Sequence, residues 1–491
     1  MKNKHQMTGF ALLPLFLLMA GAALAQGQPQ SMKGVNIKGR APVSKETLKV
    51  TLPRPWETKL ANGLQVVVLE NHKLPTFSMQ MVILSGGFSD PEGQPGVAQY
   101  VASLLREGTK TRNGKQIAEQ VDTIGASLGA NAGLSSTTST VSVSGLTDNL
   151  DQAMELFADV ILNPSFPDDE FNRLRTRAIA QLRLQRAQPG FLTGEMFSRV
   201  MYGAHPAARF SLTAEQLQKL NTDMLRQFHA AHYKPDNAIL AVVGAVKPAD
   251  IVARLNKHFG AWKGGSVTAA SIPEVADSGA GKIHLIHRPN SAQINIVLGT
   301  QTIKRTDPDY YALEVMNQIL GGGASSRLFL NLREDKGYTY GAYSGVSAQK
   351  YRGVFRANTE VRPDVTDGAM HELMYELRRL RDEKTPAAEF ENAKRTIIGS
   401  FALELESPQS VLGDFMTQKM YGLPADYWDT YPRNIAAITP EEVQRVARKY
   451  LDLDKLQVIV VGDATKISDV LKKYGTVAVY DTEGKPLKQG E

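Results

Sequence analysis

The sequence of 491 residues contains no cysteine. Without cysteine the chain can form no disulfide bond and can carry no lipid on a cysteine side chain. Hydrophobic residues make up 42% of the chain and charged residues 22%, which is typical of a globular protein with a core. Burial of apolar side chains must therefore stabilise the fold, and at this length two or more domains are expected.

Long apolar runs are absent, apart from one at the start of the chain. Lysines precede an apolar run over residues 10–24, and Ala23-Leu24-Ala25 has the small-x-small pattern of a cleavage site. The run is short for a bilayer span and is interrupted by Pro14. These features predict a cleaved signal peptide at 1–25, export to the periplasm of a Gram-negative bacterium, and no stable membrane anchor.

A strong excess of charge of one sign is also lacking. The 56 basic and 50 acidic residues are interspersed and leave a formal net charge of +6, which predicts a solvated, mixed surface. One basic cluster lies in a helical pattern without interleaved aromatic residues, so nucleic-acid binding is not expected. Its members are Arg173, Arg175, Arg177, Arg183 and Arg186.

An internal repeat divides the chain. A strand, a break and a second strand are predicted over residues 64–84, and the same order returns over 282–298. Later, a strand pattern at 237–244 returns at 455–462, each time between two helical patterns. The offset is 218 residues both from Gly63 to Gly281 (281 − 63) and from Gly244 to Gly462 (462 − 244). Equal offsets at the start and end of each half predict two duplicated domains.

The order of elements within each half predicts its fold class. Strands run in succession before long helices, which favours α+β domains, each a mainly antiparallel sheet with helices packed on one face. We expect a flexible lead-in at 26–50, an N-terminal domain at 51–263, a linker rich in glycine, serine and alanine at 264–281, a C-terminal domain at 282–475 and a tail at 476–491.

Zinc-peptidase motifs are missing as well. Neither HExxH nor HxxEH occurs, although either would place two histidines on one helix face beside a carboxylate that activates a zinc-bound water. His229 and His232 could share a helix face but have no acidic residue at ligand spacing. His284 and His287 belong to a predicted strand and point to opposite faces. We therefore expect all four histidines to be structural or surface residues.

The segment at 86–109 nevertheless resembles the active-site segment of the pitrilysin-like (M16) metallopeptidase family. In that family a glycine-rich turn leads into G-x-A-H-x-x-E-H, followed by a Gly-Thr. Here Gly96-Val97-Ala98 and Gly108-Thr109 match the two ends of this pattern.

The resemblance implies a degenerate zinc site in the N-terminal domain. Gln99 and Ser103 stand at the positions of the two zinc-binding histidines, and Ala102 stands at that of the general base. The family's third ligand, a glutamate on a later helix, is replaced by Gln181. We therefore expect no metal to be bound by this chain.

The C-terminal domain keeps the family's other signature. Residues 320–340 match GGG-x-SSRLF-x-x-LRE-x-x-G-x-x-Y at nearly every defining position. The glycines predict a chain reversal, followed by a helix that ends at Gly337 and a strand through Tyr340. This helix is expected to carry Leu328, Phe329 and Leu332 inward, and Arg327 and Glu334 to form a local ion pair.

Arg333 and Tyr340 are the functional pair of this signature. In family members that have them, the arginine and tyrosine reach the zinc-bearing domain and bind the substrate backbone, and the tyrosine helps to stabilise the tetrahedral intermediate. The chemistry is suitable, because a guanidinium donates to carbonyls and carboxylates and a phenol donates to a developing oxyanion. The sequence is expected to aim both side chains at one place.

The resemblance extends from about residue 56 to 474 and implies the LuxS/MPP-like metallohydrolase fold. It also implies an M16B-type subunit that is inactive alone and needs no cofactor of its own. A partner subunit with HxxEH and zinc would form a heterodimer or larger assembly with it, and would cleave peptides or unfolded polypeptides with Arg333 and Tyr340 supplied in trans. The alternative is a peptide-binding or scaffolding pseudo-peptidase of the cell envelope, and autonomous hydrolysis is disfavoured because no nucleophile–base pair stands out.

Overall fold

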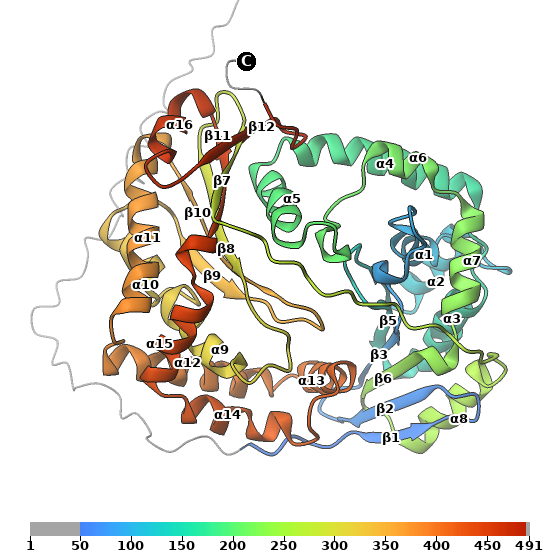
Figure 1. Ribbon diagram of the computed structural model, residues 1–491. Helices are drawn as coiled ribbons and strands as arrows, with labels where there is room; N and C mark the ends of the chain where they lie inside the picture. Colours follow the sequence, from blue (N-terminus) through green and yellow to red (C-terminus); the bar gives the residue numbers. More distant parts are fainter. Residues whose placement is uncertain (1–49, 488–491) are drawn as a thin grey trace, which may run out of the picture. The chain divides into compact units, whose positions relative to one another are not determined.

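The computed structural model describes residues 50–487 (Figure 1). The predicted signal peptide at 1–25 and the lead-in up to residue 49 lie outside this range, as do residues 488–491. The described residues belong to one compact unit. Among their helices, none combines the length and the apolar character needed to span a bilayer.

The first half is built on a six-stranded sheet. Its spatial order is β1 (Trp56–Lys59), β2 (Gln65–Glu70), β6 (Ala238–Gly244), β3 (Thr76–Ile83), β5 (Ser139–Leu146) and β4 (Ser127–Ala132). Neighbouring strands are antiparallel except β2 and β6. In β3, Phe77, Met79 and Met81 alternate toward the core of this half, as the period of two along a strand requires.

Eight helices of the described chain belong to this half. They are α1 (Val97–Leu104), α2 (Gly114–Thr123), α3 (Leu150–Leu162), α4 (Asp168–Arg186), α5 (Pro189–Tyr202), α6 (Ala214–Lys219), α7 (Thr222–His232) and α8 (Pro248–Phe259). Helices α1 and α3 pack on β4 and β5, and α7 packs on α1. The core face of the sheet is therefore covered by helices from its own half.

The second half repeats this arrangement. Its sheet has the order β12 (Val477–Tyr480), β7 (Lys282–His287), β11 (Gln457–Gly462), β8 (Ile294–Gln301), β10 (Val354–Val361) and β9 (Ala342–Val346). Its helices are α9 (Tyr310–Leu320), α10 (Arg327–Phe329), α11 (Thr366–Asp382), α12 (Ala387–Glu404), α13 (Pro408–Tyr421), α14 (Tyr427–Ala437), α15 (Pro440–Tyr450) and α16 (Ala464–Leu471). Strand β7 is parallel to β11 and β12, and the other neighbours are antiparallel.

Five strands in each sheet correspond in order and direction, which confirms the α+β fold with two duplicated domains. The outermost strands differ. Strand β1 enters the first sheet antiparallel to β2, whereas β12, which the sequence assigns to the tail, pairs parallel with β7. Between α8 and β7, residues 264–281 contain no helix or strand.

Each half also lends one helix to the sheet of the other half. Helix α5 packs on β8 and β11 of the second sheet, on the face that is turned away from the core of that half. Helix α13 packs on β6 of the first sheet in the same way, beside Val67, Leu69 and Val243. Figure 1 shows α5, in green, lying against the second sheet. Own-half helices thus cover one face of each sheet, and a helix from the opposite half covers part of the other.

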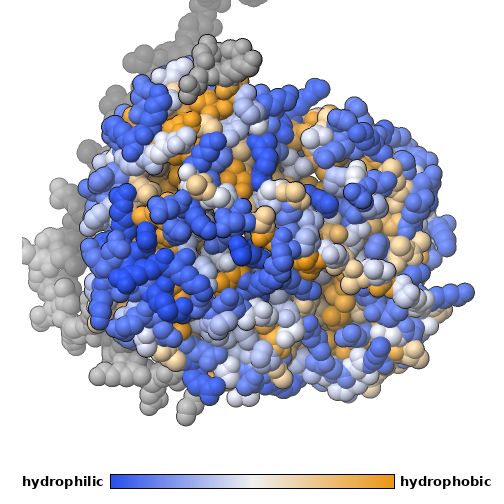
Figure 2. All heavy atoms as spheres, viewed as in Figure 1, coloured by the Kyte–Doolittle hydropathy of each residue, from blue (hydrophilic) through white to orange (hydrophobic). Residues whose placement is uncertain are grey.

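The side of the molecule seen in Figure 2 is mainly hydrophilic, with apolar residues gathered in small patches. Large hydrophobic side chains that are exposed include Leu184, Tyr340 and Leu403. This surface agrees with the interspersed charges of the sequence.

Candidate active site

Helix α1 begins at a turn that Asp90 holds in place. The Asp90 carboxylate accepts hydrogen bonds from the backbone N–H groups of Gly96 (2.6 Å) and Ala98 (2.7 Å). Gly96 has φ +97°, and a Cβ there would lie 2.5 Å from Leu212 Cδ1, so this position requires glycine. Burial raises the pKa of Asp90 to about 6, although the two N–H groups and Arg209 act in the opposite direction.

The structure places three of the four degenerate metal-site positions on α1. Ala102 is 2% exposed and belongs to the core. Ser103 is exposed, and its hydroxyl donates to the backbone carbonyl of Gln99 at 2.9 Å, one helical turn earlier. Gln181 is exposed on α4. Within residues 50–487, no three His, Cys, Asp or Glu side chains gather closely enough to hold a metal ion.

Helix α4 contacts α1 near its own start. The rings of Phe171 on α4 and Tyr100 on α1 meet edge to face, with centroids 5.8 Å apart. Phe171 is the buried residue of α4, and the later turns of this helix are more exposed. The structure therefore brings α4 to α1 without burying Gln181 beside Gln99.

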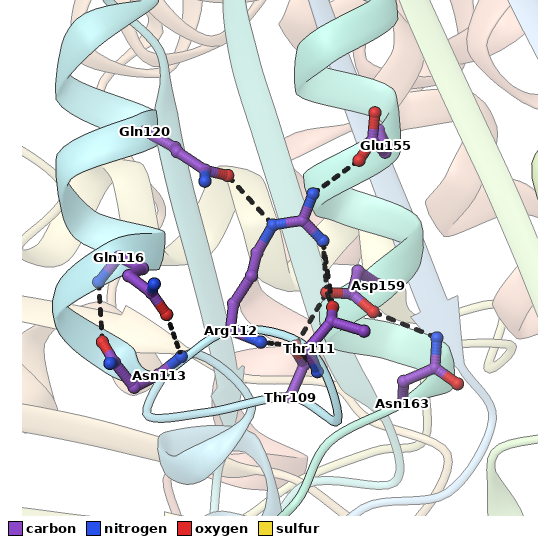
Figure 3. Close-up of polar contacts among 9 residues, drawn as sticks. All are labelled: Thr109, Thr111, Arg112, Asn113, Gln116, Gln120, Glu155, Asp159 and Asn163. Atoms are coloured by element: carbon purple, nitrogen blue, oxygen red, sulfur yellow. Dashed lines mark hydrogen bonds and ion pairs between the residues drawn. The ribbon is translucent and has the colours of Figure 1, made fainter.

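The Gly-Thr after α1 is tied to α3 by a polar cluster (Figure 3). The Thr109 hydroxyl donates to Asp159 at 2.8 Å, and Arg112 donates to the same carboxylate at 2.8 Å. Arg112 also pairs with Glu155. Asn113 then begins α2 with a capping box. The segment that follows α1 is thus held to α3 by several hydrogen bonds and ion pairs.

The histidines have protein partners. His229 donates from Nε2 to the Ile161 carbonyl at 2.8 Å, and burial lowers the pKa of this imidazole to about 4. His232 Nδ1 lies 3.0 Å from the Ser85 hydroxyl oxygen. Hydrogen bonds to protein atoms are also made by His284 and His287. These contacts agree with structural roles for all four.

The second-half signature folds largely as predicted. The Gly321 carbonyl accepts from the Ser344 N–H at 2.9 Å, and a Cβ at Gly321 would lie 2.3 Å from that nitrogen, so the chain can reverse here only with glycine. Helix α10 continues into a π-helical turn over Leu330–Asp335. Gly337 follows with φ +63° and ends it. The inward residues are confirmed: Leu328, Phe329 and Leu332 are buried.

The predicted strand through Tyr340 is wrong. Strand β9 begins at Ala342, and Tyr340 lies in the preceding loop. The cause is a local turn: the Thr339 hydroxyl donates to the Gly341 carbonyl at 3.0 Å and accepts from the Gly341 N–H at 3.1 Å. Thr359 of β10 donates to the same carbonyl at 3.1 Å. The phenol of Tyr340 is left 90% exposed on an anchored loop.

The predicted ion pair between Arg327 and Glu334 is also wrong. Arg327 is buried and donates from Nε (2.7 Å) and Nη2 (2.9 Å) to the two carboxylate oxygens of Glu389 on α12. Glu334 instead lies 3.5 Å from Arg333. A buried guanidinium needs a carboxylate in the plane of its fork, and the packed helix α12 supplies one that the local sequence does not reveal.

Two aromatic rings lie between Arg333 and the pocket of Tyr340. The guanidinium of Arg333 lies 4.7 Å from the ring centroid of Phe329, and that ring lies 5.6 Å from the ring of Tyr343. Tyr343 and Tyr340 line one pocket of about 400 Å³. Tyr340 is thus part of this pocket, whereas Arg333 lies outside its lining.

Further residues of this pocket were not singled out from the sequence. They are Arg356, Asn358 and Glu360 on β10 and Thr193 on α5. The signal that could have found the first three is their spacing of two within an apolar strand, which places them on one face. That α5 would lie beside them could not be inferred, since it comes from the other half.

Comparison with known proteins identifies the family of the chain. Residues 65–210 match the family described as insulinase (peptidase family M16), and residues 219–397 match the peptidase M16 inactive domain. Over 395 residues the chain is 25% identical to the uncharacterized zinc protease YmxG of Bacillus subtilis, covering 80% of this chain and 95% of that protein.

Solved structures resemble this chain over most of its length. A peptidase M16 inactive domain from Pseudomonas fluorescens is 29% identical with a TM-score of 0.76, covering 83% of this chain and 98% of its own. A protease from Helicobacter pylori, 22% identical with a TM-score of 0.77 over 84% and 100% of the two chains, shares the fold. The duplicated sheets and the two motif segments define a peptidase-type chain of two homologous domains. The chain belongs to the M16 peptidase family.

Proposed function

We propose that this chain is the non-zinc subunit of an exported, heteromeric M16-type peptidase. The observation that carries the proposal is the contrast between α1 and the segment at 320–340. On α1 the surrounding bonds are kept while Gln99, Ala102 and Ser103 offer an amide, a methyl and a hydroxyl. Neutral groups of this kind are poor ligands for Zn²⁺, which is bound by imidazole, thiolate and carboxylate.

The metal therefore belongs to a partner subunit that carries HxxEH. There a zinc ion would lower the pKa of a bound water and polarise the scissile carbonyl. We assign no step of that chemistry to the first half of this chain, because its donor set does not fit the ion.

Tyr340 would act on the partner's substrate through its phenol. Its side chain is 90% exposed, so the hydroxyl can reach a peptide held by another subunit. Thr339 and Thr359 fix the backbone turn around Gly341, which carries this side chain. A pre-positioned phenol can donate a hydrogen bond to the oxygen that becomes negative during hydrolysis.

Arg333 would hold the substrate backbone beside this phenol. Its guanidinium is about half exposed and lies over the Phe329 ring. Glu334 lies 3.5 Å from its Nε, and stacking leaves the Nη groups of the guanidinium to donate to peptide carbonyl groups. Extended peptides or unfolded polypeptides fit this role, since their carbonyl groups are accessible.

A second candidate is a peptide-binding pseudo-peptidase of the cell envelope. It is favoured by the pocket beside Tyr340, which is formed by this chain alone. Such a protein would hold peptides without cleaving them, with or without a zinc-bearing partner.

The test is reconstitution. The chain without residues 1–25, an exported M16-type chain with intact HxxEH, and their mixture are assayed for hydrolysis of fluorogenic peptides, with zinc measured in each. We expect zinc in the partner, none in this chain, and activity of the mixture well above that of the partner. A mixture no more active than the partner alone contradicts the split enzyme, and peptide binding without such a gain supports the second candidate.

A further inference from the structure

The outer face of the second sheet carries a polar strip beside α5. Strand β10 alternates, with Phe355 and Ala357 in the core and Arg356, Asn358 and Glu360 on the opposite face. Helix α5 covers β8 and β11 but leaves this part of β10 open. Arg356, Asn358 and Glu360, called the β10 strip below, form the floor of the pocket of about 400 Å³ that Tyr340 lines.

Arg356 lies between two glycines on the neighbouring strands. It is paired in register with Gly299 of β8 and with Gly345 of β9. On the β8 side, a Cβ at Gly299 would lie 2.5 Å from Phe197 of α5, and the guanidinium carbon of Arg356 lies 5.5 Å from the centroid of that ring. On the β9 side, a Cβ at Gly345 would meet no atom within 4 Å. A ring thus lies near the guanidinium on the β8 side, and the position of Gly345 on the β9 side is open.

Arg356 has no charge partner among the residues at 50–487. Its Nε is buried without a hydrogen bond, and its guanidinium takes part in none of the ion pairs of the described chain. Glu360, four residues along the strand, lies roughly 13 Å away by the rise of a β-strand, and accepts instead from Asn295 at 3.2 Å. Arg327, the buried arginine of the same half, has a bidentate carboxylate. A partly buried guanidinium without such a partner is one that a ligand can complete.

We infer that the β10 strip binds a carboxylate of an extended peptide, with Arg356 as its anchor. A planar guanidinium with accessible N–H groups recognises a carboxylate by two parallel hydrogen bonds. The carboxylate comes from an acidic side chain or from the C-terminus of the peptide. The inference rests on the proposed function and deepens it, because a peptide anchored at Arg356 passes Tyr340 in the same pocket. The preferred peptides are those in which the carboxylate and the segment beside Tyr340 are separated by the distance between Arg356 and Tyr340.

Direct binding to the chain without residues 1–25 tests this inference. Four fluorescently labelled peptides of one sequence are compared by anisotropy: with a free C-terminus, with one glutamate and an amidated C-terminus, with both carboxylates, and with neither. We expect at least one single-carboxylate peptide to bind about tenfold more tightly than the peptide with neither, as a charged hydrogen bond allows. The two single-carboxylate peptides identify the source.

Variants separate Arg356 from general charge. Arg356→Gln should abolish the difference between peptides, and Arg356→Lys should keep part of it. Arg362→Gln is the matched control, since Arg362 lies next to β10 but is exposed and close to Asp364 (3.5 Å). Gly345→Phe should also abolish the difference with Arg356 still in place, because a Cβ at this position meets no atom within 4 Å and the bulky ring would occupy space beside Arg356. Thermal unfolding confirms that each variant is folded.

Two outcomes overturn the inference: equal binding of all four peptides by the unaltered chain, or an unchanged preference in Arg356→Gln, whatever Gly345→Phe does. The reconstitution described above is a separate measurement. If carboxylate-dependent binding is found but the mixture gains no activity, the split enzyme fails and the binding site stands. If the mixture is active while Arg356→Gln keeps the preference, the binding site fails and the split enzyme stands.

Discussion

The segment at 86–109 in the first half and the segment at 320–340 in the second are both closely bonded to their own domains. Asp90 and Thr109 fix the first, and the Gly321 carbonyl and the Arg327–Glu389 pair fix the second. They differ in what they present to a ligand. At its degenerate metal-site positions the first offers neutral side chains, Gln99, Ala102 and Ser103, whereas the second offers an arginine and an exposed phenol. Packing and chemistry are thus carried by different positions, and one can be lost without the other.

The largest effect that distinguishes the two segments is expected in the reconstituted mixture. Tyr340→Phe removes one hydroxyl and should lower kcat by about 10²–10³-fold, as loss of an oxyanion donor does. Gln99→Ala should leave kcat within about twofold, because a neutral amide is a poor ligand for zinc. Both variants should unfold at the same temperature as the parent chain, since Tyr340 is 90% exposed. Equal losses in the two variants would remove the functional distinction.

The second effect separates the two arginines of the second segment. Arg327→Leu should lower the free energy of unfolding by about 3 kcal/mol, because it leaves Glu389 without its bidentate partner. Arg333→Leu, at an exposed position, should change it by less than about 0.5 kcal/mol. Urea unfolding measures both. A large loss for Arg333→Leu would assign that side chain to the scaffold.

The third effect concerns the general-base position of the first segment. Ala102→Glu should lower the free energy of unfolding by about 2–3 kcal/mol, because a carboxyl group would enter a core position that is 2% exposed. Ser103→Glu, on the exposed side of the same helix, is the control and should change it by less than about 0.5 kcal/mol. Tolerance of Ala102→Glu would show that α1 still has room for a catalytic carboxylate.

The smallest effect compares a buried carboxyl group in each half. Burial, assisted by Glu404, raises the pKa of Asp414 on α13 from 3.8 to about 7, and one of its oxygens is buried without a hydrogen bond. A pKa raised on folding favours the folded state in acid, and this contribution is lost as the pH rises from about 4 to about 7. Asp414→Asn should therefore add about 1–2 kcal/mol at pH 8 and nothing near pH 4, after allowance for its partial exposure.

Asp90 is the matched group of the first half. Its pKa is also raised, to about 6, but its two oxygens accept N–H groups of α1. An amide has one accepting oxygen, so Asp90→Asn should destabilise the chain across this pH range. Urea unfolding at several pH values tests both, and a stabilising Asp90→Asn would show that the start of α1 does not depend on this carboxylate.

The sequence predicted what depends on local pattern. The strand spacing and the repeat offset indicated β2, β3, β6 and their counterparts, and the position of Gly337 marked the end of a helix correctly. The failures involve side-chain contacts that the strand and helix patterns do not reveal. Tyr340 lies outside the strand predicted for it because the hydroxyl of Thr339 competes with the ladder, and Arg327 pairs with Glu389 rather than Glu334 because Glu389 lies on another helix that packs beside it. The sequence alone does not indicate a binding role for Arg356, because its cross-strand neighbours Gly299 and Gly345 are set by strand register.

The exchange of helices α5 and α13 between the halves has a consequence for how the chain can be divided. A cut in the linker at 264–281 would give two fragments, each lacking a helix that seals its sheet. Ile459 and Val461 would lose α5, and Val67 and Leu69 would lose α13, so both fragments would expose apolar strands. Co-expressed fragments should associate and restore the native fold, whereas either fragment alone should aggregate. Although duplication produced two domains, this mutual cover makes them a single unit of folding.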